Sequence, residues 1–142
     1  MPGKSLLIFI MINIFATVVL ANDKNYAPAS VIYDVTSGNI ETVKHTLDRA
    51  SLLQNIYNSD PFNASIIIVI HDEAIPLFTK NKTLIQRSKD LTMAEVIQFR
   101  LCKASARLQG YTKNDFENFI TMVPMADAEI IELQNEGYSY LR

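Results

Sequence analysis

The segment from Ala64 to Ile70 constrains the fold most, because it is almost entirely apolar. It reads Ala-Ser-Ile-Ile-Ile-Val-Ile, so both of its alternating faces carry β-branched side chains. A strand that is apolar on both faces needs cover on both sides, which is typical of a central strand in a parallel sheet between two layers of helices. The segment therefore predicts a layered α/β protein.

Helical and extended patterns alternate along the rest of the chain, which favours a mostly parallel sheet. Besides Ala64–Ile70, we expect strands at 31–35, at about 96–101, at 121–123 and in a last segment with Tyr138 and Tyr140. We expect helices at 39–57, at 73–78 (one turn only, limited by Pro76), at 83–88 and at 127–136, the last before a C-cap at Gly137. We also expect a helix that Thr112 and Asp115 open with capping-box spacing and that carries Phe116 and Phe119 or Ile120.

The segment from 92 to 110 allows two interpretations. Thr92 and Glu95 have the spacing of a capping box that opens one long helix through Cys102. Alternatively, apolar side chains alternate at 97, 99 and 101, and helix formers follow as far as Gly110. Because β-branched and aromatic residues crowd the first half, we expect a strand there, with Cys102 at the junction to a helix.

Cys102 is the only cysteine, so an intrachain disulfide is excluded. A thiol in the first turn of a helix lies near free N–H groups and the positive end of the helix dipole, which favour the thiolate. Arg100 and Lys103 could add positive charge. Cys102 is thus a candidate nucleophile, and the alternative is a small, buried hydrophobic side chain, a common role of free cysteine.

His71 directly follows the central strand, so it should lie at the same sheet edge as Cys102. It is either a base or hydrogen-bond partner for the thiol or a polar cap of the strand. His45 is expected to be solvated in the middle of its helix. The histidines and the cysteine show no metal-ligand spacing, and no nucleotide-binding or serine-hydrolase motif occurs. We therefore expect no metal and no cofactor.

The N-terminus has the features of a secretory signal. Lys4 precedes an apolar run from Leu6 to Leu20, and Val19-Leu20-Ala21 suits a signal peptidase. The run is short for a membrane span, which needs about 20 apolar residues, although an uncleaved anchor is an alternative. We expect residues 1–21 to be a signal peptide and 22–142 to form one periplasmic or secreted domain without membrane contact after cleavage.

Charge composition excludes one class of partner. Lysine and arginine number 13 against 15 acidic residues, so the net charge of −2 leaves no basic footprint for nucleic acid. In an oxidising compartment, a single thiol is left to pair between chains, to react or to be buried. Glu129, Glu132 and Glu136 have the spacing of a solvated helix face.

Several segments together match one known family. They are Phe99 to Cys102, Gly110 to Phe116, Val123-Pro124, Ala128 to Ile130 and Leu133 to Tyr140, with an opening strand at Val31–Val35 and a second strand, Ile66–His71, that ends in a histidine. On these residues the chain resembles the DsrE/DsrF-like family of sulfur-oxidation and sulfur-relay proteins over about residues 30–142. One departure is Asp72, where related sequences often have glycine.

The resemblance implies a three-layer α/β/α sandwich with a five-stranded, mainly parallel sheet, assembled as a homotrimer or homohexamer. It also favours the strand at 96–101 over the long helix. In sulfur-relay members, the cysteine that matches Cys102 carries a persulfide and passes sulfur to a partner protein.

Three functions are therefore open. The first is a sulfur carrier or sulfurtransferase, in which the Cys102 thiolate takes sulfur from a donor and delivers it to an acceptor, with His71 as a proton partner. The second is a non-catalytic oligomeric module that binds a small anion or a protein, with Cys102 merely packed. The third is a redox sensor that forms an intermolecular disulfide.

Overall fold

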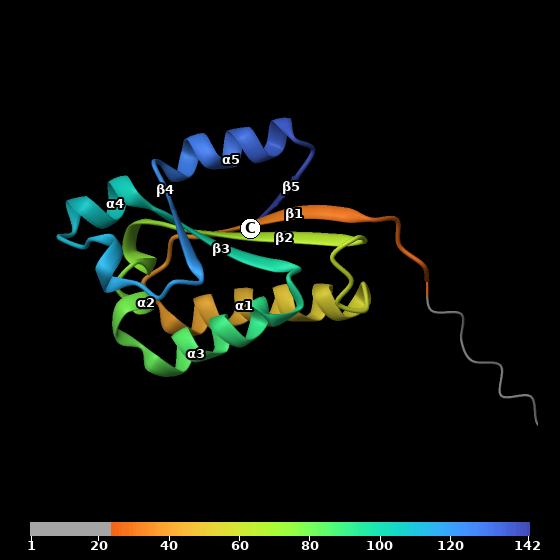
Figure 1. Ribbon diagram of the computed structural model, residues 1–142, viewed down its shortest axis with the longest axis horizontal. Coiled ribbons are helices and arrows are strands. Elements are labelled where there is room, and N and C mark those ends of the chain that lie inside the picture. The colour runs from red at the N-terminus through yellow and green to blue at the C-terminus, as the bar shows by residue number, and fades with distance from the viewer. Residues whose placement is uncertain (1–23) are drawn as a thin grey trace, which may run out of the picture.

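Five parallel strands form the centre of the molecule, and the computed structural model describes residues 24–142. The strands are β1 (Ala29–Val35), β2 (Ala64–Ile70), β3 (Ile97–Cys102), β4 (Ile120–Val123) and β5 (Ser139–Leu141). They lie side by side in the order β4-β3-β2-β1-β5, and every neighbouring pair is parallel (Figure 1). The expectation of a mainly parallel, five-stranded sheet is confirmed, and the sheet is parallel throughout.

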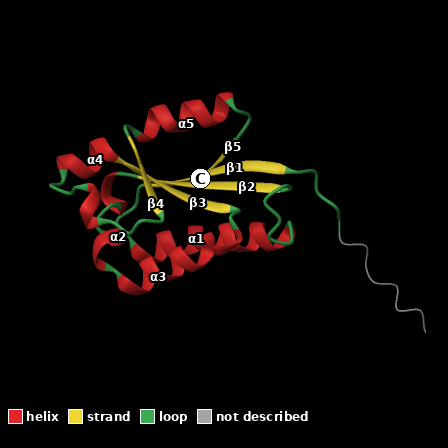
Figure 2. Cartoon of the chain, viewed as in Figure 1, coloured by secondary structure: helices red, strands yellow, loops and turns green. Residues whose placement is uncertain are grey.

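Helices cover both faces of the sheet, which confirms the layered α/β architecture (Figures 1 and 2). One face is covered by α1 (Ile40–Ile56) and α3 (Lys82–Leu91), with the single turn α2 (Leu77–Lys80) nearby, and the other by α5 (Ala126–Asn135). A short helix, α4 (Lys103–Leu108), follows β3 at the end of the sheet. Single 3₁₀ turns lie at Asp72–Ala74, Thr92–Ala94 and Lys113–Asp115.

The central strand β2 is buried on both faces, as its composition predicts. Ile66, Ile68 and Ile70 belong to the larger core beneath α1, and Ile67 and Val69 belong to a smaller core beneath α5. All five side chains are 0% exposed. Burial of one such side chain contributes about 1.5–3 kcal/mol, so this strand ties the two helical layers to one sheet.

The strand interpretation of the segment before Cys102 is confirmed, and the long helix is wrong. Glu95 has a left-handed backbone (φ 59°), which ends the 3₁₀ turn that Thr92 begins. Beyond it, Ile97 and Phe99 are buried while Gln98 between them is exposed. This period of two is the pattern of a strand with one core-facing side. Cys102 is its last residue and the N-cap of α4.

The prediction of a helix after Thr112 is wrong. Its capping box is present, with Thr112 and Asp115 bonded reciprocally, but it caps only one 3₁₀ turn. Phe116 then adopts an extended backbone and buries its ring against Tyr111, at 6.0 Å between ring centroids. Burial of an aromatic ring outweighs a local cap of about 1 kcal/mol, so the chain leaves the helix and runs toward β4.

The one-turn helix expected at 73–78 is wrong, because the chain forms the 3₁₀ turn Asp72–Ala74 and then α2, which begins after Pro76. The remaining expected elements agree with the structure to within a few residues. Leu133 of α5 is buried and Ile130 packs beside it, as the helical spacing predicts. The C-cap of α5 is Glu136, and Gly137, expected in that place, follows it with the left-handed backbone (φ 98°) that often ends a helix. The signal peptide predicted for residues 1–21 lies outside the described residues. Within 24–142, no helix has both the length and the apolar character needed to cross a membrane.

Candidate functional site

The carboxyl ends of the parallel strands bring three chemically active residues to one edge of the sheet. Asp34 is the next-to-last residue of β1, His71 directly follows β2, and Cys102 ends β3. Because neighbouring parallel strands end at the same edge, His71 and Cys102 lie there together, as expected.

The sulfur of Cys102 is held by backbone donors from two helices. Its Sγ accepts a hydrogen bond from the N–H of Ser105 at 3.4 Å, in the first turn of α4. A second bond, at 3.3 Å, comes from the N–H of Ala126, the first residue of α5. Free N–H groups at a helix start favour negative charge, so both helices stabilise a thiolate at this position.

These donors lower the pKa of the thiol. Burial is the largest single influence on the Cys102 pKa and acts to raise it. The hydrogen bonds from the backbone and side chain of Ser105, and from the backbones of Ala126 and Ala104, together outweigh burial and bring the pKa below its ordinary value. A thiol of this kind has an enlarged thiolate fraction at neutral pH.

The neighbouring cations have other roles than the one expected for them. Arg100 forms an ion pair with Glu129 of α5, on the face of the sheet that Cys102 shares. Glu129 is therefore not part of a solvated helix face, although Glu132 and Glu136 are exposed. Lys103 is exposed and points into a separate pocket.

Cys102 is covered as well as activated. The residue is 3% exposed and packs in the smaller core with Ile67, Val69, Ala126 and Leu133. A reagent in solution can reach the sulfur only after a local movement of the segments above it. Cys102 thus has features of both interpretations of the sequence, since its pKa is lowered and its side chain is packed in a core.

His71 is paired with carboxylates rather than with the thiol. Its Nε2 lies 2.6 Å from Asp34 Oδ1, and its Nδ1 lies 3.0 Å from Asp72 Oδ2. The hydrogen bond to Asp34 raises the His71 pKa, burial partly offsets this, and the negative charges of Asp34, Asp72 and Cys102 raise it further. Because both ring nitrogens face carboxylates, neither is free to accept a proton from Cys102.

Asp34 connects His71 to the edge strand β5. Its second carboxylate oxygen accepts a hydrogen bond from the hydroxyl of Tyr140. Burial raises the pKa of Asp34, but the hydrogen bonds from His71 and Tyr140, with the charges of His71 and Arg142, lower it overall. Asp34 is therefore a half-buried carboxylate that is stabilised in its ionised form.

Asp72 continues this polar network toward the thiol. Its backbone is left-handed (φ 53°), a conformation that glycine adopts without strain and aspartate tolerates. Its carboxylate accepts a hydrogen bond from Ser105 Oγ at 3.2 Å, and its carbonyl accepts one from Gln109 Nε2 at 2.7 Å. Asp72 thus adds a carboxylate that ties the loop after β2 to α4.

Sequence reasoning missed most of this network. Only His71 and Cys102 were candidates, and the structure adds Asp34, Asp72 and Ser105. One signal was available, because Asp34 is the single charged residue in an otherwise apolar strand near its carboxyl end. Ser105 carried no comparable signal, since its role depends on how α4 packs against the loop after β2.

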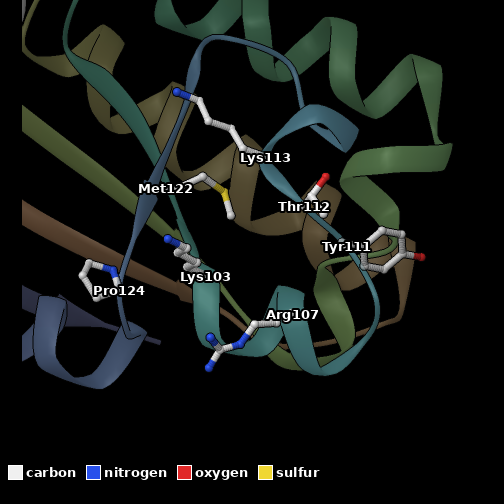
Figure 3. A pocket seen from close by; sticks show the side chains of 7 residues that line it. All are labelled: Lys103, Arg107, Tyr111, Thr112, Lys113, Met122 and Pro124. Carbon is white, nitrogen blue, oxygen red and sulfur yellow. The ribbon is translucent and has the colours of Figure 1, made fainter.

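A pocket of about 340 Å³ lies between α4, the loop after it and the end of β4 (Figure 3), and Cys102 is not one of its lining residues. Its lining residues are Lys103, Arg107, Tyr111, Thr112, Lys113, Met122 and Pro124. Sequence analysis did not detect it. Elsewhere in residues 24–142, no group of three or more histidine, cysteine, aspartate or glutamate side chains is arranged to hold a metal ion.

Comparisons with known proteins place the chain in a sequence family. A model of the DsrE/DsrF-like family matches residues 30–142. No match was found among curated proteins.

Solved structures share the fold. A protein of unknown function from Methanobacterium thermoautotrophicum is 17% identical with a TM-score of 0.72, over 80% of this chain and 98% of that one. A conserved protein of unknown function from Bacteroides thetaiotaomicron is 16% identical with a TM-score of 0.63, over 79% of this chain and 92% of the other. At this level of identity, the likeness concerns architecture alone.

Proposed function

The chain belongs to the DsrE/DsrF-like family, which is associated with sulfur relay, and from this premise we propose that it carries sulfur as a persulfide on Cys102. The observation that carries the proposal is the pair of hydrogen bonds from Ser105 and Ala126 to one sulfur atom. They lower the pKa of the thiol without any charged neighbour in direct contact with it.

The proposed reaction has two steps. The thiolate of Cys102 attacks the outer sulfur of a sulfane donor, a sulfur–sulfur bond forms on Cys102, and the donor's own bond to that sulfur breaks. The donor's remainder leaves with the electron pair, as a thiolate, a shorter polysulfide or a sulfinate, and as sulfite when the donor is thiosulfate. A thiolate of the acceptor then attacks the outer sulfur of the Cys102 persulfide, takes that sulfur and releases the Cys102 thiolate.

Access to the sulfur requires a local opening, because Cys102 is 3% exposed. The short helix α4 has few buried contacts, since Ala106 is its one fully buried residue and Leu108 at its end is 88% exposed. Elements with few buried contacts open at low free-energy cost. We therefore include a brief displacement of α4 in the proposed cycle.

Mass spectrometry tests the carrier function directly. The purified protein is treated with thiosulfate or with polysulfide, and the Cys102 peptide is expected to gain the mass of one sulfur atom, which a reducing thiol removes. Cys102→Ser is the control and should gain nothing. A wild-type thiol that takes up no sulfur and is also inert to alkylation at neutral pH would overturn the proposal.

A second function is favoured by the low exposure of Cys102. On this alternative, the protein is a non-catalytic oligomeric module that binds a small anion or a protein at the same edge, with Cys102 as a packing residue. The combination of no sulfur uptake and no alkylation supports it. A redox sensor would instead form a disulfide-linked dimer on non-reducing gels, and that dimer would be lost in Cys102→Ser.

We extend the proposal to assembly and location. The resemblance suggests a homotrimer or homohexamer, and the N-terminal sequence suggests export to the periplasm or the medium. Light scattering after size-exclusion chromatography measures the number of subunits in the assembly. N-terminal sequencing of the protein from separated cell fractions shows where the protein is located and whether residues 1–21 have been removed. A cytoplasmic protein that retains residues 1–21 would contradict export.

A further inference from the structure

The pocket beside α4 combines an apolar wall with three cations. Tyr111, Met122 and Pro124 supply apolar surface, while Lys103, Arg107 and Lys113 supply positive charge. In Figure 3, the side chain of Met122 lies between those of Lys103 and Lys113, and Arg107 extends from α4. The lining contains no acidic residue, in a protein whose net charge is −2.

The three cations have no acidic partners in the described part of the chain. Its ion pairs involve Lys44, Arg87, Arg100 and His71, and none involves a lining residue of the pocket. All three side chains are exposed to solvent, so their positive charges are available to a ligand in the cavity, and water and salt screen their mutual repulsion. An anion would relieve what remains of this repulsion.

Local structure holds the cations around the cavity. Lys103 and Arg107 are four residues apart on α4, so they lie on one side of the helix. Lys113 lies in the 3₁₀ turn that the Thr112–Asp115 capping box closes. Tyr111 is fixed by its backbone hydrogen bond to Ala106 at 2.9 Å and by its ring contact with Phe116. The pocket is therefore preformed, which is usual for small-molecule sites.

We propose that this pocket binds a small organic anion, with an apolar body against Met122, Tyr111 and Pro124 and an anionic head among Lys103, Arg107 and Lys113. A volume of about 340 Å³ suits a small molecule with an aryl or short alkyl body. An inorganic anion would leave the apolar wall uncovered, and a neutral molecule would leave the cations unpaired. A guanidinium favours planar oxyanions and binds them through two parallel hydrogen bonds.

The pocket and the thiol share two chain segments. Lys103 directly follows Cys102, and the carbonyl of Pro124 accepts a hydrogen bond from the N–H of Ala104 at 3.2 Å. Two residues after Pro124, the N–H of Ala126 binds the sulfur. A ligand that contacts Lys103 and Pro124 therefore acts on the segments that cover Cys102.

Resting on the proposed carrier function, the ligand class is an organic sulfane donor such as an aryl thiosulfonate. Cys102 is 3% exposed and does not line the pocket, so the transfer step follows the same local opening that exposes the sulfur in the proposed cycle. The Cys102 thiolate then attacks the terminal sulfur of the thiosulfonate. The new sulfur–sulfur bond forms as the bond from that sulfur to the sulfonyl sulfur breaks, and an aryl sulfinate leaves with the electron pair. Atoms and charge balance without an oxidant or a reductant.

Binding is tested with p-toluenesulfonate, which has the apolar body and the anionic head but no transferable sulfur. Titration followed by NMR should give saturable shifts of the backbone amides of residues 103–113 and 122. Inorganic sulfate and the neutral 4-methylbenzyl alcohol should each bind at least about tenfold more weakly, because each satisfies only half of the site. Equal binding of the neutral alcohol, or shifts confined to other surfaces, would overturn the proposal.

A matched pair of variants tests the cations. The double variant Arg107→Gln, Lys113→Gln should weaken p-toluenesulfonate binding by about tenfold or more, through loss of two charge-assisted contacts. Lys80→Gln, Lys89→Gln makes the same change in net charge on exposed helical positions away from the pocket and should bind as the wild type does. Equal affinity in both double variants would contradict the site.

The same reagents separate this inference from the carrier function. Cys102→Ser should bind p-toluenesulfonate normally, because binding does not use the thiol. If it does so while p-toluenethiosulfonate transfers no sulfur to the wild type, the pocket stands and the carrier function fails. If sulfur transfer is equally fast in Arg107→Gln, Lys113→Gln, the carrier function stands and the donor role of the pocket fails.

Discussion

The properties of Cys102 come from backbone N–H groups, which a point mutation of a side chain removes only indirectly. Ser105 is the exception, because both its backbone and its hydroxyl lower the Cys102 pKa. The hydroxyl has a single proton, which it donates either to Cys102 or to Asp72, so Ser105 is where the polar network meets the thiol. The first prediction therefore concerns this side chain.

Ser105→Ala should make the thiol less acidic while the N–H bonds at positions 105 and 126 remain. One hydrogen bond is worth about 0.5–1.5 kcal/mol, so the rate of alkylation by iodoacetamide at neutral pH should fall roughly two- to tenfold. The pH profile of the rate should move toward higher pH. Ser51→Ala, on a partly exposed part of α1, is the control, and an unchanged profile in Ser105→Ala would contradict the role of the hydroxyl.

A second prediction concerns the pH dependence of stability. Asp34 and Asp72 raise the pKa of His71, so the folded state binds this proton more tightly than the unfolded state does. The resulting stability is fully present below the ordinary histidine pKa of about 6.5 and is lost as the pH rises through the folded-state pKa. His71→Gln should abolish this decline.

The measurement is the free energy of unfolding in urea at several pH values from 6 upward. His45→Gln, at an exposed position on α1, should retain the wild-type decline. At acid pH, stability should instead fall as the pH is lowered, because the pKa of Asp34 is lower in the folded state than in the unfolded state. The contribution of Asp34 to the free energy of unfolding is lost as the pH falls from the ordinary aspartate pKa of about 3.9 through the folded-state pKa. An identical alkaline decline in wild type and His71→Gln would refute the assignment.

Among the elements, the loop between α4 and β4 shows how burial overrides local sequence preference. Its capping box forms, yet only the 3₁₀ turn Lys113–Asp115 follows. Phe116 is 8% exposed and contacts Tyr111, so the loop is held by the core rather than by helical hydrogen bonds. The same loop carries Lys113 into the pocket.

Phe116→Ala should therefore be costly despite its position in a loop. Removing a buried phenylalanine side chain costs about 3 kcal/mol or more, and we expect a loss near that value in the free energy of unfolding. Phe62→Ala is the matched control, because Phe62 is 93% exposed and its loss should change stability by about 0.5 kcal/mol or less. Similar costs for both variants would show that the loop is not anchored by this ring.

For the whole molecule, the decisive feature is a sheet that is covered on both faces. Neighbouring residues of β2 point to opposite sides, Ile67 toward α5 and Ile68 toward α1, and both are 0% exposed. A sheet with one solvated face would bury only one of them. The two helical layers are thus held through a single strand.

Ile67→Ala and Ile68→Ala should each cost about 2–5 kcal/mol in the free energy of unfolding, measured by denaturant titration. Gln98→Ala, on an exposed position of the adjacent strand β3, should cost far less and serves as the control. A small cost for either isoleucine variant would mean that the corresponding helical layer does not pack as the structure has it.

The sequence by itself determined the architecture and the junction at Cys102. The apolar pattern of Ala64–Ile70 and the alternation before Cys102 are local signals, because a strand's period and burial depend on its own residues. These signals led to the five-stranded sheet and to a thiol at its carboxyl edge.

Tertiary structure alone decided the surroundings of that thiol. The N–H of Ala126, the link from Asp72 to Ser105, and the cations around Met122 join residues that are far apart in the chain. The outcome of the segment after Thr112 was likewise decided by the burial of Phe116 in the core. Such contacts depend on how the sheet and helices pack in space, and no periodicity within a segment contains that information.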